Sequence, residues 1–361
     1  IASVSYDITA PIITLTFDQF SRDNYTYSTA DSVVLVTATW DERAEPTEPT
    51  PTISVDYGGD DGLEQDTSGA MIMNEGDSTI WTFEITIPSG DFNNGNVLFT
   101  ITGTDLAGNA FVQNEETLVM IDTLVVDNIL PTVEFSYSNV SQPTLDEWKR
   151  GKAGDIIDIT ATFNEPTHLI NDPLINIQYA TDSTVNVAPT TSSNDDSVWI
   201  FRTILLPDTS DNTPNTGYIT VTSDATDRAG NPIGTSDSAA IFYTDNILPT
   251  FSLTAPDSGS YVNHTLVDYM LNESIQSGSI TWTRLSGNAD ANSPHIISLD
   301  ESERLDSELY RDFALSGWVD SLVSETYYEV KFSAIDSSNN QSIDFIETPV
   351  YYDTTGSSVT V

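Results

Sequence analysis

The sequence predicts an all-β fold in which antiparallel β-sandwiches follow one another along the chain. Short segments rich in Val, Ile, Thr and aromatic residues are separated by polar turns, and within them apolar and polar residues alternate, as they do from Val33 to Thr39. No stretch has a convincing helical period. An Asp-containing phrase also recurs at intervals of one small domain, which indicates a tandem array.

The recurring phrase divides the chain into repeats. Each copy of the phrase contains one aspartate, which we call the leading aspartate: Asp7, Asp127, Asp245 and, in a degenerate copy, Asp353. Successive leading aspartates lie 120, 118 and 108 residues apart. We expect sandwich domains at 1–126, 127–244 and 245–352, with 353–361 as the first strand of a following repeat or a tail. Because the chain starts and ends within a repeat, we expect it to be part of a longer one.

The first two domains each contain seven candidate strands. In the first domain they are 12–17, 32–40, 52–57, 70–74, 81–87, 97–102 and 117–121. In the second domain they are 132–137, 155–164, 174–179, 185–188, 198–206, 217–222 and 239–243. The third domain follows with looser spacing. Seven short strands with frequent turns favour an antiparallel sandwich, because two sheets can then bury their apolar faces against each other.

The composition narrows the range of functions. The chain has 55 acidic and 11 basic side chains, and its formal net charge is -44. This excludes nucleic acid as an expected partner, because phosphate binding needs clustered Lys and Arg, and it favours cations. A strongly acidic surface also keeps a protein dispersed without any ligand, so both roles of the charge stay open. Cysteine is absent, and cohesion must therefore come from packing or from metal.

Signals for membranes and for catalysis are missing from the sequence. There is no apolar run of about 18 residues, and the apolar start at Ile1 lacks a basic flank, so we expect neither a membrane span nor a signal peptide in this chain. Any export signal or anchor is expected outside it. A nucleophile elbow, a phosphate-binding loop, a Gly-rich dinucleotide turn and a His–carboxylate pair are also absent, so we expect no enzymatic activity.

Two further motifs recur once in each domain. The first motif ends the second candidate strand and consists of Asp or Asn followed by Glu. We call its glutamates the second-strand glutamates; they are Glu42, Glu165 and Glu273. The other follows the sixth candidate strand with the pattern Asp-x-x-x-Asn, where Gly and Asn tolerate the positive φ of a tight turn. Its turn aspartates are Asp105, Asp227 and Asp336, and its turn asparagines are Asn109, Asn231 and Asn340.

The three motifs are expected to meet at one pole of each sandwich. If the strands run up and down in sequence order, the loops after the second, fourth and sixth strands return to the pole where the chain enters. In the first domain this gathers Asp7, Glu42, Asp105 and Asn109. Calcium takes about six to eight oxygen ligands, which carboxylates, Asn amides and turn carbonyls supply. The motifs therefore predict a calcium site.

The same acidic motifs are also compatible with turns that hold no metal. Asp and Asn are ordinary turn residues whose side chains can bond neighbouring amides. An EF-hand does not fit, because the sixth position after each turn aspartate is not glycine. Zinc is not expected, since His168, His264 and His295 fall in unrelated positions, as surface or turn residues, and thiolates are absent.

The leading Asp-x-x-x-Pro phrase, the Asp-x-Ala-Gly-Asn turn and the strand ending in Asp or Asn before Glu resemble the tandem bacterial and archaeal immunoglobulin-like domains of large prokaryotic surface proteins. These include adhesin stalks and surface-layer proteins. The Cys and Trp pattern of antibody domains is missing. The resemblance implies immunoglobulin-like sandwiches at the cell surface, stiffened by calcium near the domain junctions.

The resemblance also extends the set of candidate metal ligands. Carried over to the second and third domains, it implies ligation by Asp127, Glu165, Asp227, Asn231, Asp245, Glu273, Asp336 and Asn340. The third domain departs most, because Ser-Asn replaces Ala-Gly in its turn. Acidic turns at the opposite pole are expected to add ligands from the preceding domain, namely Asp91, Asp208 and Asp211.

The expected partners are the neighbouring immunoglobulin-like domains of the same chain, with identical subunits or surface glycans as further partners. No Gly/Ser-rich linker separates the domains, so we expect a stiff rod. The basic segment at 148–152 is expected to be a solvated loop or to dock an acidic neighbour. The alternative function is an adhesin module that binds glycan or protein through aromatic residues of the third domain: Trp282, Trp318, Tyr327 and Tyr328.

Overall fold

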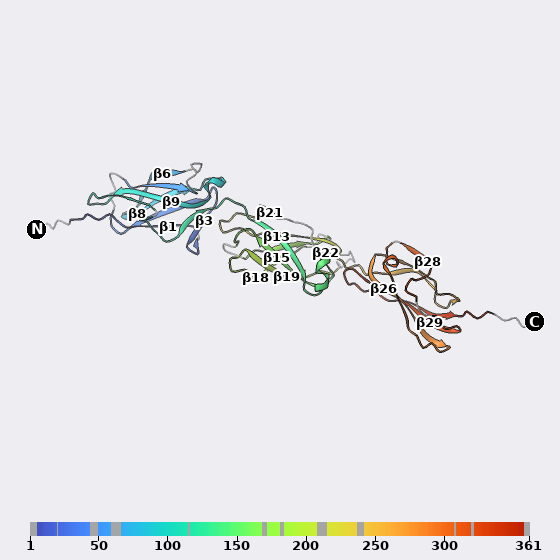
Figure 1. Ribbon diagram of the computed structural model, residues 1–361. Coiled ribbons are helices and arrows are strands. Elements are labelled where there is room, and N and C mark those ends of the chain that lie inside the picture. The colour runs from blue at the N-terminus through green and yellow to red at the C-terminus, as the bar shows by residue number, and fades with distance from the viewer. Residues whose placement is uncertain are drawn as a thin grey trace, which may run out of the picture.

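The computed structural model describes residues 6–19, 21–43, 50–58, 66–114, 116–167, 172–180, 184–207, 215–236, 242–306, 308–318 and 321–356. Within these ranges the regular structure is almost entirely β, and its helical elements are three short 3-10 turns: η1 (Asp91–Asn93), η2 (Pro143–Trp148) and η3 (Glu301–Glu303). Figure 1 shows three sandwiches arranged end to end, with the two termini at opposite ends. The predicted all-β fold is confirmed.

The first sandwich contains two sheets. One has the strand order β11-β1-β4-β8-β7 and the other β2-β3-β12-β9-β5-β6, with β10 paired to β9. The strands of the first sheet are β1 (Ile13–Phe17), β4 (Val33–Trp40), β7 (Ile72–Asn74), β8 (Asp77–Thr86) and β11 (Val119–Met120). Those of the second are β2 (Ser21–Arg22), β3 (Tyr25–Ser28), β5 (Thr52–Tyr57), β6 (Thr67–Ala70), β9 (Gly95–Thr104), β10 (Ala110–Gln113) and β12 (Thr123–Val126).

The second sandwich repeats this plan, with sheets ordered β18-β19-β15-β13-β21 and β14-β22-β20-β16-β17. The strands of the former are β13 (Thr132–Asn139), β15 (Ile156–Phe163), β18 (Pro189–Ser192), β19 (Val198–Ile204) and β21 (Thr235–Ser236). Those of the latter are β14 (Arg150–Gly151), β16 (Ile175–Gln178), β17 (Thr184–Val187), β20 (Gly217–Ser223) and β22 (Phe242–Thr244).

The third sandwich has a smaller first sheet, ordered β23-β25-β28, and a second sheet ordered β24-β30-β29-β26-β27. The first contains β23 (Phe251–Ala255), β25 (Val267–Leu271) and β28 (Leu309–Phe313). The second contains β24 (Tyr261–Val262), β26 (Ile275–Gly287), β27 (His295–Ser298), β29 (Thr326–Asp336) and β30 (Phe345–Tyr352).

Each sandwich has its own hydrophobic core, built from the alternating residues of its two sheets. In β15, for example, Ile157, Ile159 and Ala161 are fully buried, while the residues between them face outward. The three clusters of buried apolar residues lie within residues 13–126, 133–242 and 251–352. The period-two pattern of the sequence therefore decides which face of each strand packs inward.

The chain crosses between the two sheets at places that the sequence did not mark. The candidate strand 117–121 covers β11, which runs parallel to β1, whereas the following β12 pairs with β3 and β9 in the other sheet. The candidate strand 70–74 includes the end of β6 and all of β7, which belong to different sheets. Where the chain crosses from sheet to sheet its alternation continues, so periodicity cannot reveal the crossing.

The β2–β3 hairpin of the first domain was not predicted. Its turn residues Asp23 and Asn24 have positive φ values of 56° and 68°. Asp and Asn are the residues that enter this conformation most readily after glycine, so the pair was a usable turn signal. Among the residues described, no helix is long and apolar enough to cross a membrane.

Candidate metal centres

The structure gathers three carboxylates at one pole of each sandwich. In each group, one candidate ligand atom per residue lies within 4.8 Å of the other two. Each group contains one leading aspartate, one second-strand glutamate and one turn aspartate: Asp7, Glu42 and Asp105; Asp127, Glu165 and Asp227; Asp245, Glu273 and Asp336. In the second and third domains this pole adjoins the preceding domain.

The leading aspartates connect each junction to the preceding domain. The main-chain N–H of Asp127 donates to the carbonyl of Ser28, and that of Asp245 donates to the carbonyl of Gly151, both at 2.9 Å. The Asp127 carboxylate also accepts the N–H of Ile129 at 3.0 Å. This local bond is the turn conformation typical of Asp, and a carboxylate oxygen of Asp127 lies within 4.8 Å of ligand atoms of Glu165 and Asp227.

The second-strand glutamates are positioned by the residues that precede them. In each domain the residue before the glutamate accepts a hydrogen bond through its side-chain oxygen. The donor is the main-chain N–H of the residue that directly follows the Asp phrase, and the distances are 2.8, 2.7 and 2.6 Å. The pairs are Asp41 with Ile12, Asn164 with Thr132 and Asn272 with Thr250. The Asp-or-Asn position of this motif therefore holds the incoming segment beside the glutamate.

The turn aspartates lie in tight turns of the same geometry. In the second domain, the Asp227 carboxylate accepts the N–H and the side-chain amide of Asn231, both at 2.8 Å. Gly230 has φ 92°, and in the third domain Asn339 adopts the same left-handed region with φ 63°. Because Asn tolerates this conformation, the Ser-Asn substitution preserves the turn.

The turn asparagines connect the turn to the leading phrase. The Asn231 amide nitrogen donates to the main-chain carbonyl of Asp127 at 2.8 Å, and Asn340 does the same to Asp245 at 2.8 Å. In the first domain Asn109 makes a longer bond of 3.3 Å to Asp7. These contacts use the amide nitrogen to hold the leading aspartate in place, whereas ligation of a cation by the amide oxygen stays a prediction.

The clusters concentrate negative charge in partly buried surroundings. The turn aspartates Asp105, Asp227 and Asp336 are at most 1% exposed. Burial, together with the neighbouring leading and turn aspartates, raises the pKa of Glu165 and of Glu273 to about 7. Burial also raises the pKa of Asp227 and Asp245. Without a counter-charge, this arrangement disfavours full ionisation.

Basic side chains do little to neutralise these groups. Within the described ranges, none of the nine cluster carboxylates forms a salt bridge with Lys, Arg or His. At the third cluster the field of Arg150 lowers the pKa of Asp245, but this effect is smaller than those of burial and of Asp336. Three convergent carboxylates with an all-oxygen donor set are able to bind a hard divalent cation.

Sequence reasoning missed two residues that organise the junctions, Asn128 and Asn246. The Asn128 side chain accepts the N–H of Ala30 at 2.6 Å and donates to the carbonyl of Pro88 at 3.2 Å. Asn246 likewise accepts the N–H of Ala153 at 2.7 Å and donates to the carbonyl of Leu206 at 3.2 Å. The usable signal was Asn directly after the leading aspartate in the copies at Asp127 and Asp245.

The structure corrects two expectations about exposed residues. His295 is not a surface residue, since it is 4% exposed and lies 2.8 Å from Asp290. Trp282 and Tyr328 are fully buried in the third core and cannot form a binding face. His168, Asp208, Asp211 and the Asp91 side chain lie outside what the structure describes.

The basic segment at 148–152 contacts both its own domain and the next domain. Arg150 lies over the ring of Tyr243, 4.9 Å from the ring centre. The Lys152 amine donates to the main-chain carbonyl of Asn339 in the third domain. Of the two roles expected for this segment, docking against the next domain is the one its contacts match.

Comparison with known proteins adds little to the assignment of this fold. No family model matches the chain, and no curated protein matches it. The FN1–FN3 domains of chicken CNTN1 align with 93% of this chain and 98% of their own, at 10% identity and a TM-score of 0.25. Dimeric latent PorU from Porphyromonas gingivalis aligns with 95% of this chain, at 9% identity and a TM-score of 0.22. This chain spans only 34% of that PorU chain. The fold assignment therefore rests on the sheet order and the separate hydrophobic cores.

Proposed function

We propose that this chain is a structural segment of an extracellular prokaryotic surface protein, a stalk or surface-layer element whose tandem immunoglobulin-like domains are stiffened by calcium. The proposed role is not enzymatic. The partners in this role are the neighbouring domains of the same chain, with identical subunits as candidates in a surface layer.

One observation carries this proposal: the cluster at each internal junction includes a residue of the linker itself. Asp127 is bonded through its N–H to Ser28 of the first domain and through its carbonyl to Asn231 of the second. A cation held by Asp127, Glu165 and Asp227 would fix the linker to the second domain. Loss of linker freedom stiffens the junction, and relief of carboxylate repulsion stabilises the fold.

The donor set favours calcium over other metals. The candidate ligands are carboxylate oxygens, which suit hard cations, whereas zinc prefers nitrogen and sulfur. Calcium also accepts irregular geometry more readily than magnesium does. We therefore propose calcium as the cofactor, with ligands from the leading aspartate, second-strand glutamate and turn aspartate of each domain, and with the turn asparagines Asn109, Asn231 and Asn340 as additional candidates.

Calcium and chelator titrations test the proposal directly. Isothermal calorimetry on the chelator-treated chain should show calcium binding, and small-angle scattering should show the largest dimension becoming better defined as the sites fill. Binding that is undetectable at millimolar calcium, with unchanged scattering, would falsify the proposal. Magnesium at the same concentration should bind more weakly.

The second candidate function is an adhesin module for glycan or protein. In place of the buried Trp282 and Tyr328, the third domain has a row of one exposed and two half-buried tyrosines on three neighbouring strands. Tyr261 is 76% exposed, and its ring centre lies 5.2 Å from that of Tyr351, which lies 4.7 Å from that of Tyr327. A glycan array with the wild-type chain and with Tyr261→Ala tests this candidate.

A further inference from the structure

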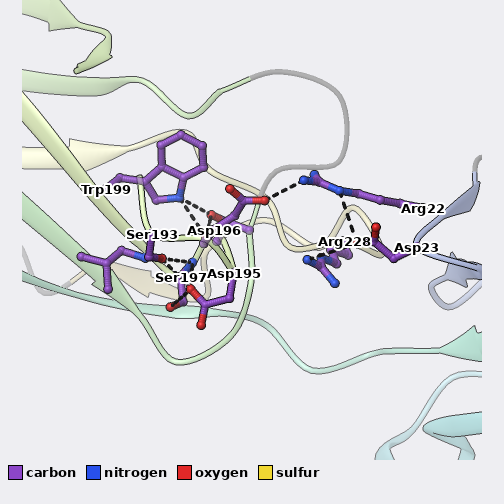
Figure 2. Close-up of polar contacts among 10 residues, drawn as sticks. Arg22, Asp23, Ser193, Asp195, Asp196, Ser197, Trp199 and Arg228 are labelled. Carbon is purple, nitrogen blue, oxygen red and sulfur yellow. Dashed lines mark hydrogen bonds and ion pairs between the residues drawn. The ribbon is translucent and has the colours of Figure 1, made fainter. Parts of the chain in front are cut away.

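The junction between the first and second domains carries charged contacts that belong to neither cluster. Arg22, on the β2–β3 hairpin of the first domain, donates a 2.7 Å hydrogen bond to the carboxylate of Asp196 in the second. Beside it, the guanidinium of Arg228 in the second domain lies 3.9 Å from the carboxylate of Asp23 on the hairpin. Figure 2 shows these four side chains meeting across the junction. Each of the two domains thus contributes one arginine and one aspartate to the contact.

Both sides of this contact are fixed by local structure. Asp196 lies in a turn, and its main-chain carbonyl accepts the indole N–H of Trp199 and the hydroxyl of Thr167, each at 2.9 Å. Arg22 is paired with Tyr25 across the two-residue hairpin turn. The side chains of Arg22 and Asp196 are 29% and 12% exposed, respectively. Forming an ion pair that is partly shielded from solvent and held by ordered turns costs less side-chain entropy than forming one between free surface side chains.

The second junction has different chemistry. Besides the bonds of Asn246, its side-chain contacts include the Lys152 bond to the Asn339 carbonyl and a hydrogen bond from the Asn339 amide to Gln142. In the parts of the chain that the structure describes, no salt bridge joins the second and third domains. The position of Arg228 in the turn motif is Leu106 in the first domain and Ser337 in the third. The paired charges are therefore a property of the first junction.

We propose that Arg22–Asp196 and Arg228–Asp23 form an ionic clasp that keeps the first two domains aligned without any bound cation, and that high salt releases it. Screening shortens the range of charge interactions from about 10 Å at 0.1 M salt to about 3 Å at 1 M. The clasp makes the alignment of the first junction more sensitive to ionic strength than that of the second, where the described residues form no ion pair between domains. This inference is independent of calcium, and a chelator separates the two.

Distances between domains can be measured by pulsed electron paramagnetic resonance, because the chain has no cysteine of its own. Spin labels at Glu84→Cys and Glu134→Cys report on the first junction, and labels at Glu134→Cys and Ile296→Cys report on the second. Each pair is measured in chelator at low salt and in 1 M NaCl. The variants are Arg22→Gln and the charge exchange Arg22→Asp with Asp196→Arg.

Arg202→Gln is the matched control, because it breaks a 2.7 Å pair with Asp158 inside the second domain and crosses no junction. Circular dichroism and thermal melting check that each variant is folded.

At low salt the wild-type first junction should give a narrow distance distribution. Salt or Arg22→Gln should lower the ratio of aligned to bent molecules about fivefold, which corresponds to about 1 kcal/mol. The charge exchange should restore the narrow distribution, and Arg202→Gln should match the wild type.

Three results would overturn the clasp: a wild-type first junction that is already broad in chelator at low salt, an Arg22→Gln distribution equal to wild type, or equal salt effects at both junctions. Failure of the charge exchange to restore alignment would reject the specific Arg22–Asp196 pairing. Because every measurement is made in chelator, none of these results bears on calcium binding, which the titrations above decide.

Discussion

The side-chain amide of Asn231 donates a 2.8 Å hydrogen bond to the main-chain carbonyl of Asp127, a residue 104 positions earlier in the chain. This contact brings the turn after β20 onto the linker between two domains. It gives the Asp phrase two tasks, since the same residue marks the start of a domain and supplies a carboxylate to its pole. Changes at this pole should therefore affect the carboxylate cluster and the junction together.

Calcium should raise the thermal stability of the chain. A ligand that binds only the folded state stabilises it by about 2.7 kcal/mol at a hundredfold excess over its dissociation constant. Differential scanning calorimetry in calcium, in magnesium and in chelator should show the highest transition temperatures in calcium. Equal transitions in calcium and in chelator would contradict the proposed sites.

Replacing Asp127 by Ala should loosen the first junction without unfolding either domain. The substitution removes a cluster carboxylate and the local bond to Ile129, but it keeps the main-chain bonds to Ser28 and Asn231. Small-angle scattering in calcium should show a less extended, more variable rod, while circular dichroism stays unchanged. Glu134→Ala, an exposed carboxylate in β13, is the control. A rod indistinguishable from wild type would count against a junction role for Asp127.

The cation-free chain should become less stable as the pH rises from about 4.5 to about 7. The folded-state pKa values of Glu165 and Glu273 are about 7, against 4.5 for an unperturbed glutamate. In this window the folded state binds more protons than the unfolded state, so the free energy of unfolding falls with increasing pH. In calcium the trend should reverse, because protons compete with the cation.

Glu165→Gln isolates this effect from the general loss of negative charge in acid. In chelator the variant should be more stable than wild type at pH 8 and should show a weaker pH dependence. In calcium it should lose part of the stabilisation that the wild type gains. Thermal melts of both proteins across the pH series provide the measurement, and parallel curves for the two would rule out Glu165 as the source.

Asn128→Ala should destabilise the first domain by about 0.5–1.5 kcal/mol, because partly buried main-chain groups lose their partners. The N–H of Ala30 and the carbonyl of Pro88 would be left without this side chain. Calorimetry should show a lower transition for one domain. Asn186→Ala is a suitable control, since its bond to Asn176 is exposed and should contribute much less. Equal effects of the two substitutions would argue against the structural role of Asn128.

Gly230→Asn should be tolerated far better than Gly230→Val. Gly230 has φ 92°, and Asn339 already occupies the corresponding position of the third domain with φ 63°. A Cβ at Gly230 would meet no atom within 4 Å, so the difference reflects backbone conformation. A β-branched residue should cost about 1–2 kcal/mol more than Asn there. Urea unfolding of the two variants tests the difference, and equal stabilities would show that the turn relaxes.

Much of the fold could be read from the sequence, because sandwiches bury one face of each strand and the alternation of residues records that face. The strand crossings between sheets could not be read, since β6 and β7 form one continuous pattern in sequence although they pair in different sheets. The buried His295 was also missed. Its neighbours Asp290 and Tyr328 come together only when β26, β27 and β29 assemble.

The sequence by itself determined the tandem repeat, the all-β class and the types of residue at each pole, because these depend on local periodicity and turn chemistry. Only the tertiary structure decided how those residues are used. It turned the amide nitrogen of Asn231 toward the linker, made Asn128 part of the junction, and paired Arg22 with Asp196, which is 174 residues away. Contacts between distant segments depend on how the domains pack, and no local pattern in a single chain encodes that packing.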